Sequence, residues 1–575
     1  MPRLVRQGLS TIQYVGRALG GFNLFLNLAS VVTITIAIGW PTSATARICV
    51  VVMAALIIGV FAFEEIQRRR AGGPTELLMG LRPLPRVVTS AAALVVETAV
   101  DHRTWLIIAA GILMALLVGE GAVRRPVKGA TPQAARIKGG DVPIPSRVAT
   151  TWYFTATTLS VFLIALCSAL QISQIPGLIA VTVSLLIALL VGLQSARYLV
   201  GRNRFERNLP QLLEAYGPVF AFHWQAPAGT AYQAAMWLPY LERLGKPYFI
   251  LARTQANFDE LVKMTDAPVI LRVGLEDLDA VVCSSLKTVF YANTAVRNSH
   301  MIRFPQLTHI QLNHGDSDKI ASVSPTFRQY DRNFVAGQAA IDRFAKHGVS
   351  TLPEQFEIVG RPQLEHVEAA ARPIGDIENP TVLYSPTWSG FYDDSDYSSL
   401  SAGATIVQEL VDRGCTVIFR PHPYARRHGG NARACDEIID LLTRNVAETG
   451  RQHVFGPTAE TTMSVVDCFN ASDAMVSDVS SVVSDYLISG KPFAMAAVSS
   501  HGETFVEEFP LARAAYVFDV PRGSREALAL PERLDEMLGT DPIADDRKAL
   551  RSYYLTDTPP ERIADRFIDT ALRYL

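Results

Sequence analysis

The feature that most constrains the fold of this 575-residue chain is a set of long apolar runs confined to its first third. About 20 apolar residues in a helix cross the hydrocarbon core of a bilayer. Trp105–Val118 is short for this purpose, and Val87–Val100 is weakened by polar residues, among them Glu97. The sequence therefore predicts five or six membrane-spanning helices, which form a transmembrane domain over residues 1–205. The four stronger runs are Phe22–Trp40, Ile48–Phe63, Trp152–Leu170 and Ile175–Leu199.

The positions of the basic residues favour six spans. Cytoplasmic loops of membrane proteins carry an excess of Lys and Arg. The basic loops of this chain all fall on one side of the membrane only if Val87–Val100 spans it. We therefore expect three helical hairpins integral to the cytoplasmic membrane, with both termini and the soluble domain on the cytoplasmic side. The residues that decide this are Arg3, Arg6 and Arg17, then Arg68, Arg69, Arg70, Arg82 and Arg86, then Arg124, Arg125, Lys128, Arg136, Lys138 and Arg147, and finally Arg197, Arg202, Arg204 and Arg207.

From about Pro210 onward, short strand-like runs alternate with helical patterns. Such alternation predicts parallel sheets with helices on both faces. The series stops at Glu368–Pro380 and then restarts, which indicates two doubly wound units: residues 206–370 and residues 371–575. Ligands of such folds bind at the carboxyl ends of the strands, so the default site is the cleft between the two units. The first series of predicted strands is Val219–His223, Pro247–Ala252, Val269–Val273, Thr288–Ala292, His309–Leu312 and Asn333–Val335; the second is Thr381–Tyr384, Thr416–Phe419, Ala474–Val476 and Phe493–Ala496.

Two histidines follow predicted strands at positions where they could project into a cleft. His314 precedes Gly315 after the strand His309–Leu312, and its alternative is a loop histidine satisfied by nearby backbone. His422 lies between two prolines and follows Arg420, a permanent cation. A rigidly held histidine and arginine suit the binding of a diphosphate and the stabilisation of its departure. The alternative there is a stiff turn with a solvated charge.

Two further clusters lie at strand ends in the second unit. Tyr384–Trp388 contains Pro386 and Thr387, and taken alone it is an ordinary strand exit. In the other cluster, Ser480 and Ser481 come where a strand ends and a helix begins. The free N–H groups and hydroxyls at a helix start can bind phosphate, although a capped helix without ligand explains the same residues. Asp485 follows about one turn later and could reach ribose hydroxyls, and Lys491 lies beyond it.

Other common kinds of site find no support in the sequence. The six cysteines form no CxxC or Cys/His cluster, so neither a zinc site nor a disulfide framework is indicated. The chain contains no Walker-type loop and no GxSxG elbow. The acidic stretch Asp393–Asp396 resembles a DxD metal site, but it lies in a polar loop and is predicted to be solvated. No metal or cofactor and no nucleic-acid partner are therefore expected.

The order of the four clusters resembles that of the CDP-glycerol glycerophosphotransferase family, which includes the teichoic-acid glycerol- and ribitol-phosphate transferases. The resemblance extends from about Phe304 to Ala497. The elements that carry it are His314-Gly315, Tyr384-x-Pro386-Thr387-Trp388, Arg420-x-His422-Pro423, Asp478-x-Ser480-Ser481, Asp485 and Lys491-Pro492.

Three positions depart from the family pattern. Asn313 stands where the family usually has Trp, and Ser389 stands where an Arg usually follows Pro-Thr-Trp. The family's Gly-x-Pro-Arg-x-Asp is replaced by Gly360-Arg361-Pro362-Gln363-Leu364-Glu365. These departures leave the exact substrate open more than the type of reaction.

The resemblance implies a GT-B fold and a transferase that moves glycerol- or ribitol-phosphate from a CDP-activated donor to a hydroxyl of a lipid-linked glycan or polymer. His314 would act as general base, and His422 with Arg420 would stabilise the departing CMP. The donor phosphates would contact Ser480 and Ser481. Asp485 would contact the ribose, and Thr387 and Lys491 would complete the donor site. Membrane lipids and the lipid-linked acceptor are the expected partners.

Two alternatives remain open at this point. The same fold could transfer a sugar from another nucleotide donor during synthesis of a surface polysaccharide. The chain could also be a transporter or scaffold with a degenerate nucleotide-binding domain, since an acid inside a span, such as Glu97, can mark a transport path. Donor specificity separates the sugar transferase from the polyol-phosphate transferase: the former would use UDP- or GDP-activated compounds and the latter CDP-activated ones.

Overall fold

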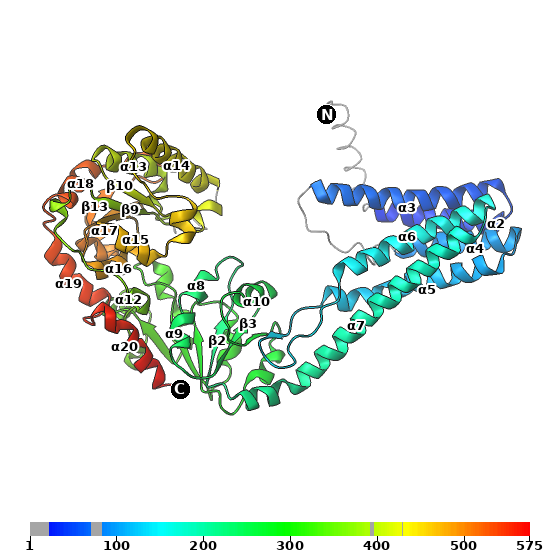
Figure 1. The fold of residues 1–575 in the computed structure, drawn as a ribbon, viewed down its shortest axis with the longest axis horizontal. Helices are drawn as coiled ribbons and strands as arrows, with labels where there is room; N and C mark the ends of the chain where they lie inside the picture. Colours follow the sequence, from blue (N-terminus) through cyan, green and yellow to red (C-terminus); the bar gives the residue numbers. More distant parts are fainter. Residues whose placement is uncertain (1–21, 71–82, 391–395, 428) are drawn as a thin grey trace. The chain divides into compact units, whose positions relative to one another are not determined.

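The computed structural model describes residues 22–70, 83–390, 396–427 and 429–575. The chain divides into two compact units, Met1–Leu209 and Pro210–Leu575 (Figure 1). Several residues used in the sequence interpretation lie outside the described residues: Arg3, Arg6, Arg17, Arg82, and the first three residues of the acidic stretch, Asp393, Asp394 and Ser395.

All six apolar runs of the first unit are helical. Within the described part of the chain, five helices, α3 to α7, are long and apolar enough to cross a membrane, and α2 is a shorter apolar helix. The last helix continues past the predicted end at Leu199 and includes the point where the chain divides into its two units. The elements are α2 (Phe22–Gly39), α3 (Ala44–Arg70), α4 (Pro83–Val100), α5 (Thr104–Lys128), β1 (Ala134–Ala135), α6 (Arg147–Leu170) and α7 (Ile175–Tyr216).

The weak hydropathy of the Val87–Val100 run is explained by the position of α4, which packs against α2, α3, α5 and α6. Its polar side chains are paired inside the bundle. Arg86 forms an ion pair with Glu120 of α5, and both side chains are fully buried. Glu97 pairs with Arg103 at an N–O distance of 2.7 Å. A helix surrounded by other helices needs less apolar surface than one that faces lipid, because its polar groups find partners in the protein.

The second unit contains two sheets in which every described strand pair is parallel. The predicted parallel α/β architecture is therefore confirmed. The strands of this unit have the order β4-β3-β2-β5-β6-β7-β8 in the first sheet and β10-β9-β11-β12-β13 in the second. The strands are β2 (Phe220–Trp224), β3 (Tyr248–Ala252), β4 (Val269–Leu271), β5 (Thr288–Tyr291), β6 (Thr308–Gln311), β7 (Arg332–Val335), β8 (Phe356–Ile358), β9 (Thr381–Ser385), β10 (Thr416–Phe419), β11 (Ala474–Ser477), β12 (Phe493–Ala497) and β13 (Tyr516–Asp519).

Helices cover both faces of the second sheet. Leu383 of β9 belongs to a core cluster with residues of α15, α16 and α17, whereas its neighbours Val382 and Tyr384 belong to a cluster with residues of α13, α14 and α18. This follows from the alternation of side chains along a strand. The helices of this half are α13 (Gly403–Asp412), α14 (Gly429–Thr449), α15 (Val465–Ala471), α16 (Ser481–Tyr486), α17 (Gly502–Glu508), α18 (Leu530–Leu538), α19 (Ala544–Tyr554) and α20 (Pro560–Leu572).

The helices that accompany the first sheet are short. The predicted helix Ala231–Leu244 forms two pieces, and Pro239 occupies the first turn of the second piece, where its missing N–H group costs least. The C-terminal helix α20 returns to the first sheet, because Phe567 packs on Trp237 and Phe334. Figure 1 shows α19 and α20 in red along the second unit. The first-half helices are α8 (Tyr232–Ala235), α9 (Leu238–Glu242), α10 (Gln255–Leu261), α11 (Asn298–Ile302) and α12 (Gln338–Lys346).

Candidate active site

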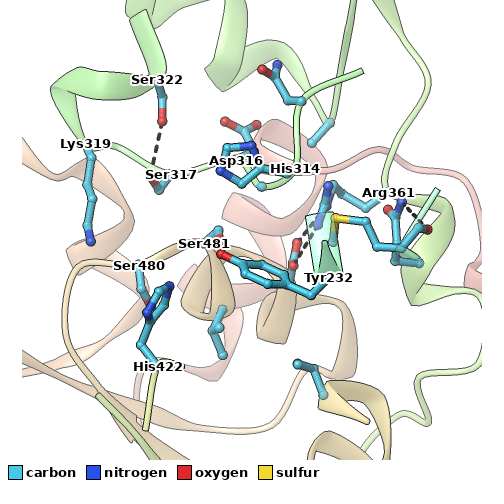
Figure 2. A pocket seen from close by; sticks show the side chains of 18 of the residues that line it. Tyr232, His314, Asp316, Ser317, Lys319, Ser322, Arg361, His422, Ser480 and Ser481 are labelled. Atoms are coloured by element: carbon cyan, nitrogen blue, oxygen red, sulfur yellow. Dashed lines mark hydrogen bonds and ion pairs between the residues drawn. The ribbon is translucent and has the colours of Figure 1, made fainter. Parts of the chain in front are cut away.

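A cavity of about 670 Å³ in the second unit is lined by residues that follow strands of both sheets. Seven of the eight predicted site residues line this cavity: His314, Thr387, Arg420, His422, Ser480, Ser481 and Asp485. Figure 2 shows His314 and Lys319 extending from one segment, with His422, Ser480 and Ser481 on the segments opposite them. The cavity therefore brings together seven predicted residues that are up to 171 residues apart in the sequence, from His314 to Asp485.

His314 has the hydrogen bonding of a general base. Its Nδ1 lies 3.0 Å from the carbonyl oxygen of Ala292. Because a carbonyl only accepts hydrogen bonds, Nδ1 carries the proton and Nε2 keeps its lone pair. Desolvation by the surrounding walls lowers the pKa of His314, and the positive charge of Arg361 lowers it further. The imidazole is therefore neutral at neutral pH, and its ring remains accessible within the cavity.

His422 has the opposite tautomer. The backbone N–H of Tyr424 donates to His422 Nδ1 at 3.1 Å, so the proton of the neutral ring lies on Nε2. Burial lowers the pKa of His422 to about 4, and the positive charge of Lys319 acts in the same direction. The ring also stacks on Trp388, with the ring centres 6.2 Å apart. His422 is therefore a neutral hydrogen-bond donor at neutral pH.

These two protonation states predict the pH dependence of the reaction. A base whose pKa is lowered becomes protonated only at more acidic pH. We therefore expect kcat/KM to fall on the acid side below pH 6.5, the ordinary pKa of histidine. Measuring kcat/KM against pH checks this, and a midpoint above pH 6.5 would contradict the assignment of His314 as a neutral base.

Arg420 lines the cavity, but part of its guanidinium group is already used. Its Nη1 donates to the carbonyl oxygens of Ala459 and Met463, the latter at 2.7 Å. Lys491 is absent from the cavity lining. Its buried ammonium donates to the carbonyl oxygens of Phe469 (2.8 Å) and Ser472 (2.7 Å). Lys491 therefore ties a loop to the second sheet, and the predicted donor contact is not made in this geometry.

Lys319 is a cavity residue that the sequence interpretation left without a role. Its Nζ donates to Thr387 Oγ1 at 3.2 Å, and it forms no ion pair with any described residue. Burial lowers its pKa, while the carboxylate of Asp478 opposes that effect. Asp478 also accepts hydrogen bonds from the backbone N–H groups of Thr387 and Ser399, each at 2.9 Å. The position of Lys319 five residues after His314 was the signal that could have identified it.

The two serines occupy the start of α16. Ser480 is the N-cap residue, but its side chain makes no capping hydrogen bond. Its hydroxyl lies 3.5 Å from that of Ser477. Because α16 has only six residues, its dipole is small. The hydroxyl groups are therefore the more important feature of this segment.

Asp485 is engaged with an arginine that the sequence interpretation did not select. Arg361 Nε lies 3.0 Å from Asp485 Oδ1, and Arg361 Nη2 lies 3.2 Å from Oδ2. Both side chains are buried, and both residues line the cavity. Desolvation raises the pKa of Asp485, and the charge of Arg361 opposes this rise. The predicted ribose contact of Asp485 therefore has to coexist with an ion pair.

Gly315 lies where the His314 loop meets α16. A Cβ atom added at this position would lie 2.7 Å from Ser481 Oγ and 2.9 Å from Ser481 Cβ. We expect Gly315→Ala to displace His314 and to lower kcat about 100-fold, the usual cost of a misplaced catalytic group. Gly430→Ala is the matched control, because a Cβ there meets nothing within 4 Å. Steady-state kinetics of both variants test this, and an unchanged kcat in Gly315→Ala would refute the tight contact.

Residues 367–501 match the family described as CDP-Glycerol:Poly(glycerophosphate) glycerophosphotransferase. This segment contains the Thr387, Arg420, His422, Asp478–Ser481, Asp485 and Lys491 motifs, while His314 precedes it. No curated protein sequence matches this chain at a significant level.

Several solved structures are similar at low identity. The wall teichoic acid polymerase TagF is 14% identical, covers 66% of this chain and 97% of its own, and has a TM-score of 0.39. Anabaena Alr3699/HepE, solved with UDP and glucose, is 14% identical over 61% of this chain and 98% of its own, with a TM-score of 0.36. A putative UDP-N-acetylglucosamine 2-epimerase from Listeria monocytogenes is 11% identical over 62% and 96%, with a TM-score of 0.41.

These structural likenesses are too distant to decide function, so the assignment depends on the family match and on the ordered motifs that it contains. The match covers strands β9 to β12 of the second sheet and the loops that follow them, where the predicted donor-side residues lie. The resemblance found in the sequence is thereby confirmed: residues 367–501 are similar to the CDP-glycerol:poly(glycerophosphate) glycerophosphotransferases.

Proposed function

We propose that this protein transfers a polyol-phosphate, either glycerol- or ribitol-phosphate, from a CDP-activated donor to a hydroxyl group of a lipid-linked glycan or polymer. The observation that supports this most strongly is the arrangement of one cavity. It has a neutral base, His314, facing a segment that carries a neutral hydrogen-bond donor, His422, and two serine hydroxyls. Such a cavity offers both groups that phosphoryl transfer to a hydroxyl requires: a proton acceptor and donors for the leaving phosphate.

In the proposed reaction, the acceptor hydroxyl gives its proton to His314 Nε2 while its oxygen attacks the phosphorus that carries the polyol. The bond between this phosphorus and the oxygen that bridges to the nucleotide breaks, and CMP leaves with the bonding electron pair. The product is a phosphodiester between acceptor and polyol. His314 then loses its proton to solvent, which returns the base to its neutral form.

The departing CMP phosphate gains negative charge and needs stabilisation. His422 Nε2–H and the hydroxyls of Ser480 and Ser481 can donate hydrogen bonds to it. Lys319 supplies a positive charge that no described carboxylate pairs with directly. Arg420 then serves mainly to fix the backbone beside the cavity, because its Nη1 donates hydrogen bonds to two backbone carbonyl oxygens. Charge-assisted hydrogen bonds of this kind are the main source of catalysis in phosphoryl transfer.

We also propose that the first unit anchors the enzyme in the cytoplasmic membrane, with the catalytic unit on the cytoplasmic side. The five helices that could span a membrane and the one-sided distribution of basic loops support this orientation. A lipid-linked acceptor lies at the same membrane surface.

Metal independence is a further prediction of this scheme. We expect EDTA to leave the rate of CMP release unchanged, because Lys319 and the hydrogen-bond donors offset the phosphate charge. Among the described residues, no group of three or more His, Cys, Asp or Glu side chains could hold a metal ion. Loss of activity with EDTA and its recovery with Mg²⁺ would show that a metal bound with the donor is required.

The donor is identified by measuring CMP release from CDP-glycerol and from CDP-ribitol by detergent-solubilised protein with a membrane lipid extract. The proposal predicts release that depends on the extract and occurs with one or both of these donors. Consumption of UDP- or GDP-sugars without CMP release would instead indicate a sugar transferase.

A further inference from the structure

The cation that the sequence assigned to the phosphates, Arg420, is partly committed to backbone carbonyls, so a second arginine of the cavity lining is a candidate for this task beside Lys319. Arg361 is an arginine in the cavity lining, and it comes from the first sheet rather than the second. It lies beside the cavity in Figure 2. Its positive charge also contributes to the lowered pKa of His314, after desolvation.

The backbone around Arg361 is fixed before any ligand binds. Gly360 has a φ of +76°, and a Cβ there would meet the side chains of Ile563 and Thr556 at 3.0 and 3.1 Å. Pro362 restricts Arg361 to extended backbone, and its φ and ψ are −121° and 93°. The N–H of Leu364 also donates to the carbonyl oxygen of Arg361 at 3.0 Å. The side chain of Arg361 therefore starts from a rigid turn.

Asp485 fixes the other end of the side chain. The ion pair uses Nε and Nη2 of Arg361, at 3.0 and 3.2 Å, so one edge of the planar guanidinium faces the carboxylate. Nη1 is left without a hydrogen bond to any described residue. In this arrangement, Asp485 orients the guanidinium, and its Nη1 N–H groups remain available as charge-assisted donors for an anion.

We propose that Arg361 is a phosphate-binding residue of this transferase, held in orientation by Asp485. This inference rests on the proposed function for the identity of the substrate, but not for the presence of the anion site itself. The ligand is a phosphate group, which could belong to the nucleotide donor or to a phosphate-bearing acceptor. Asp485 is then a positioning residue, which orients Arg361.

The experiment measures binding by the full-length, detergent-solubilised protein of two probes, CDP and sn-glycerol phosphate, by titration calorimetry. Arg361→Gln removes the charge, but it leaves Asp485 buried without a partner and could disturb folding. The double variant Arg361→Gln/Asp485→Asn avoids this, because a neutral amide pair keeps polar contacts without a buried charge. Arg243→Gln is the matched control: Arg243 pairs with Glu365 at 2.7 Å, near the same turn but outside the cavity lining.

We expect the double variant to retain the wild-type unfolding temperature and to bind at least one probe about 10- to 100-fold more weakly, the usual worth of a charge-assisted hydrogen bond. A loss confined to CDP assigns the phosphate to the donor, and a loss confined to glycerol phosphate assigns it to the acceptor. In both cases the Arg361→Lys variant should bind the affected probe more tightly than the double variant but more weakly than the wild-type protein. The reason is that an ammonium group keeps the charge but cannot pair side-on with Asp485. Wild-type affinity of the double variant for both probes would overturn the proposal. Failure of the proposed function would appear separately, as probe binding by the wild-type protein without CMP release from any CDP donor.

Discussion

Replacing His314 with alanine is expected to lower the rate of CMP release by about 10²- to 10⁴-fold, the usual contribution of a general base. The reason is that His314 Nε2 keeps a free lone pair in the cavity, because Nδ1 carries the ring proton and donates it to the carbonyl oxygen of Ala292. Affinity for CDP should change little, because His314 acts on the acceptor hydroxyl rather than on the nucleotide.

The matched control is His366→Ala. His366 is largely exposed and is not among the residues that line the cavity. Steady-state release of CMP by both variants, with a titration of CDP beside it, is the measurement. If His314→Ala kept more than about a tenth of the wild-type rate, general-base catalysis by this residue would be excluded, since such catalysis contributes at least about 10²-fold to the rate.

Replacing Asp478 with alanine is expected to reduce the stability of the catalytic unit by about 3–5 kcal/mol, because three buried hydrogen-bond donors would lose their acceptor. Asp478 is fully buried. It accepts hydrogen bonds from Thr387 N, Ser399 N and Ser399 Oγ, each at 2.9 Å. The change would also release the loop that carries Thr387 and would remove the carboxylate that supports the charge of Lys319.

Thermal unfolding of the detergent-solubilised protein measures this loss, and Asp473→Ala provides the control. Asp473 directly precedes β11, the strand that Asp478 follows, but its side chain accepts one backbone hydrogen bond, from Thr381 at 2.8 Å, and it is less buried. Its replacement should therefore cost only about 1 kcal/mol. Equal losses in the two variants would show that the hydrogen bonds of Asp478 are not the source of its effect.

The sequence predicted the strands of both sheets where apolar runs were bounded by turn residues, but it missed β8 and β13. β8 contains Glu357 between two apolar residues and is only half buried, so its pattern is weak. The position of α4 could not be predicted either. Its low hydropathy follows from buried ion pairs such as Arg86–Glu120, and Glu120 lies beyond the end of the apolar run from which α5 was recognised.

The order of motifs predicted most of the site, because residues that follow parallel strands meet at one edge of a sheet. It could not show which polar groups of these residues were already occupied. Lys491 and Arg420 hold backbone carbonyls, and these bonds depend on loops that are distant in sequence. The two histidines both follow strands, yet they have opposite tautomers, because their Nδ1 atoms face a carbonyl in one case and an N–H group in the other.

Arg361 was missed for a related reason. It was seen only as a departure from the family pattern, since the arginine precedes Pro362 instead of following it. Its partner Asp485 lies 124 residues away in sequence, in helix α16, which follows a strand of the second sheet. A pairing of this kind is set by how the two halves of the catalytic unit pack, and local sequence contains no signal for it.

The most direct test of the account is the fate of the polyol-phosphate itself. Detergent-solubilised protein would be incubated with CDP-glycerol labelled in the glycerol group and with a membrane lipid extract, and both the CMP and the label in the lipid fraction would be counted. The account predicts that label enters the lipid-linked acceptor in equal amount to the CMP released, and that His314→Ala abolishes both. CMP released without transfer of label, or with the label recovered as free glycerol phosphate, would contradict it.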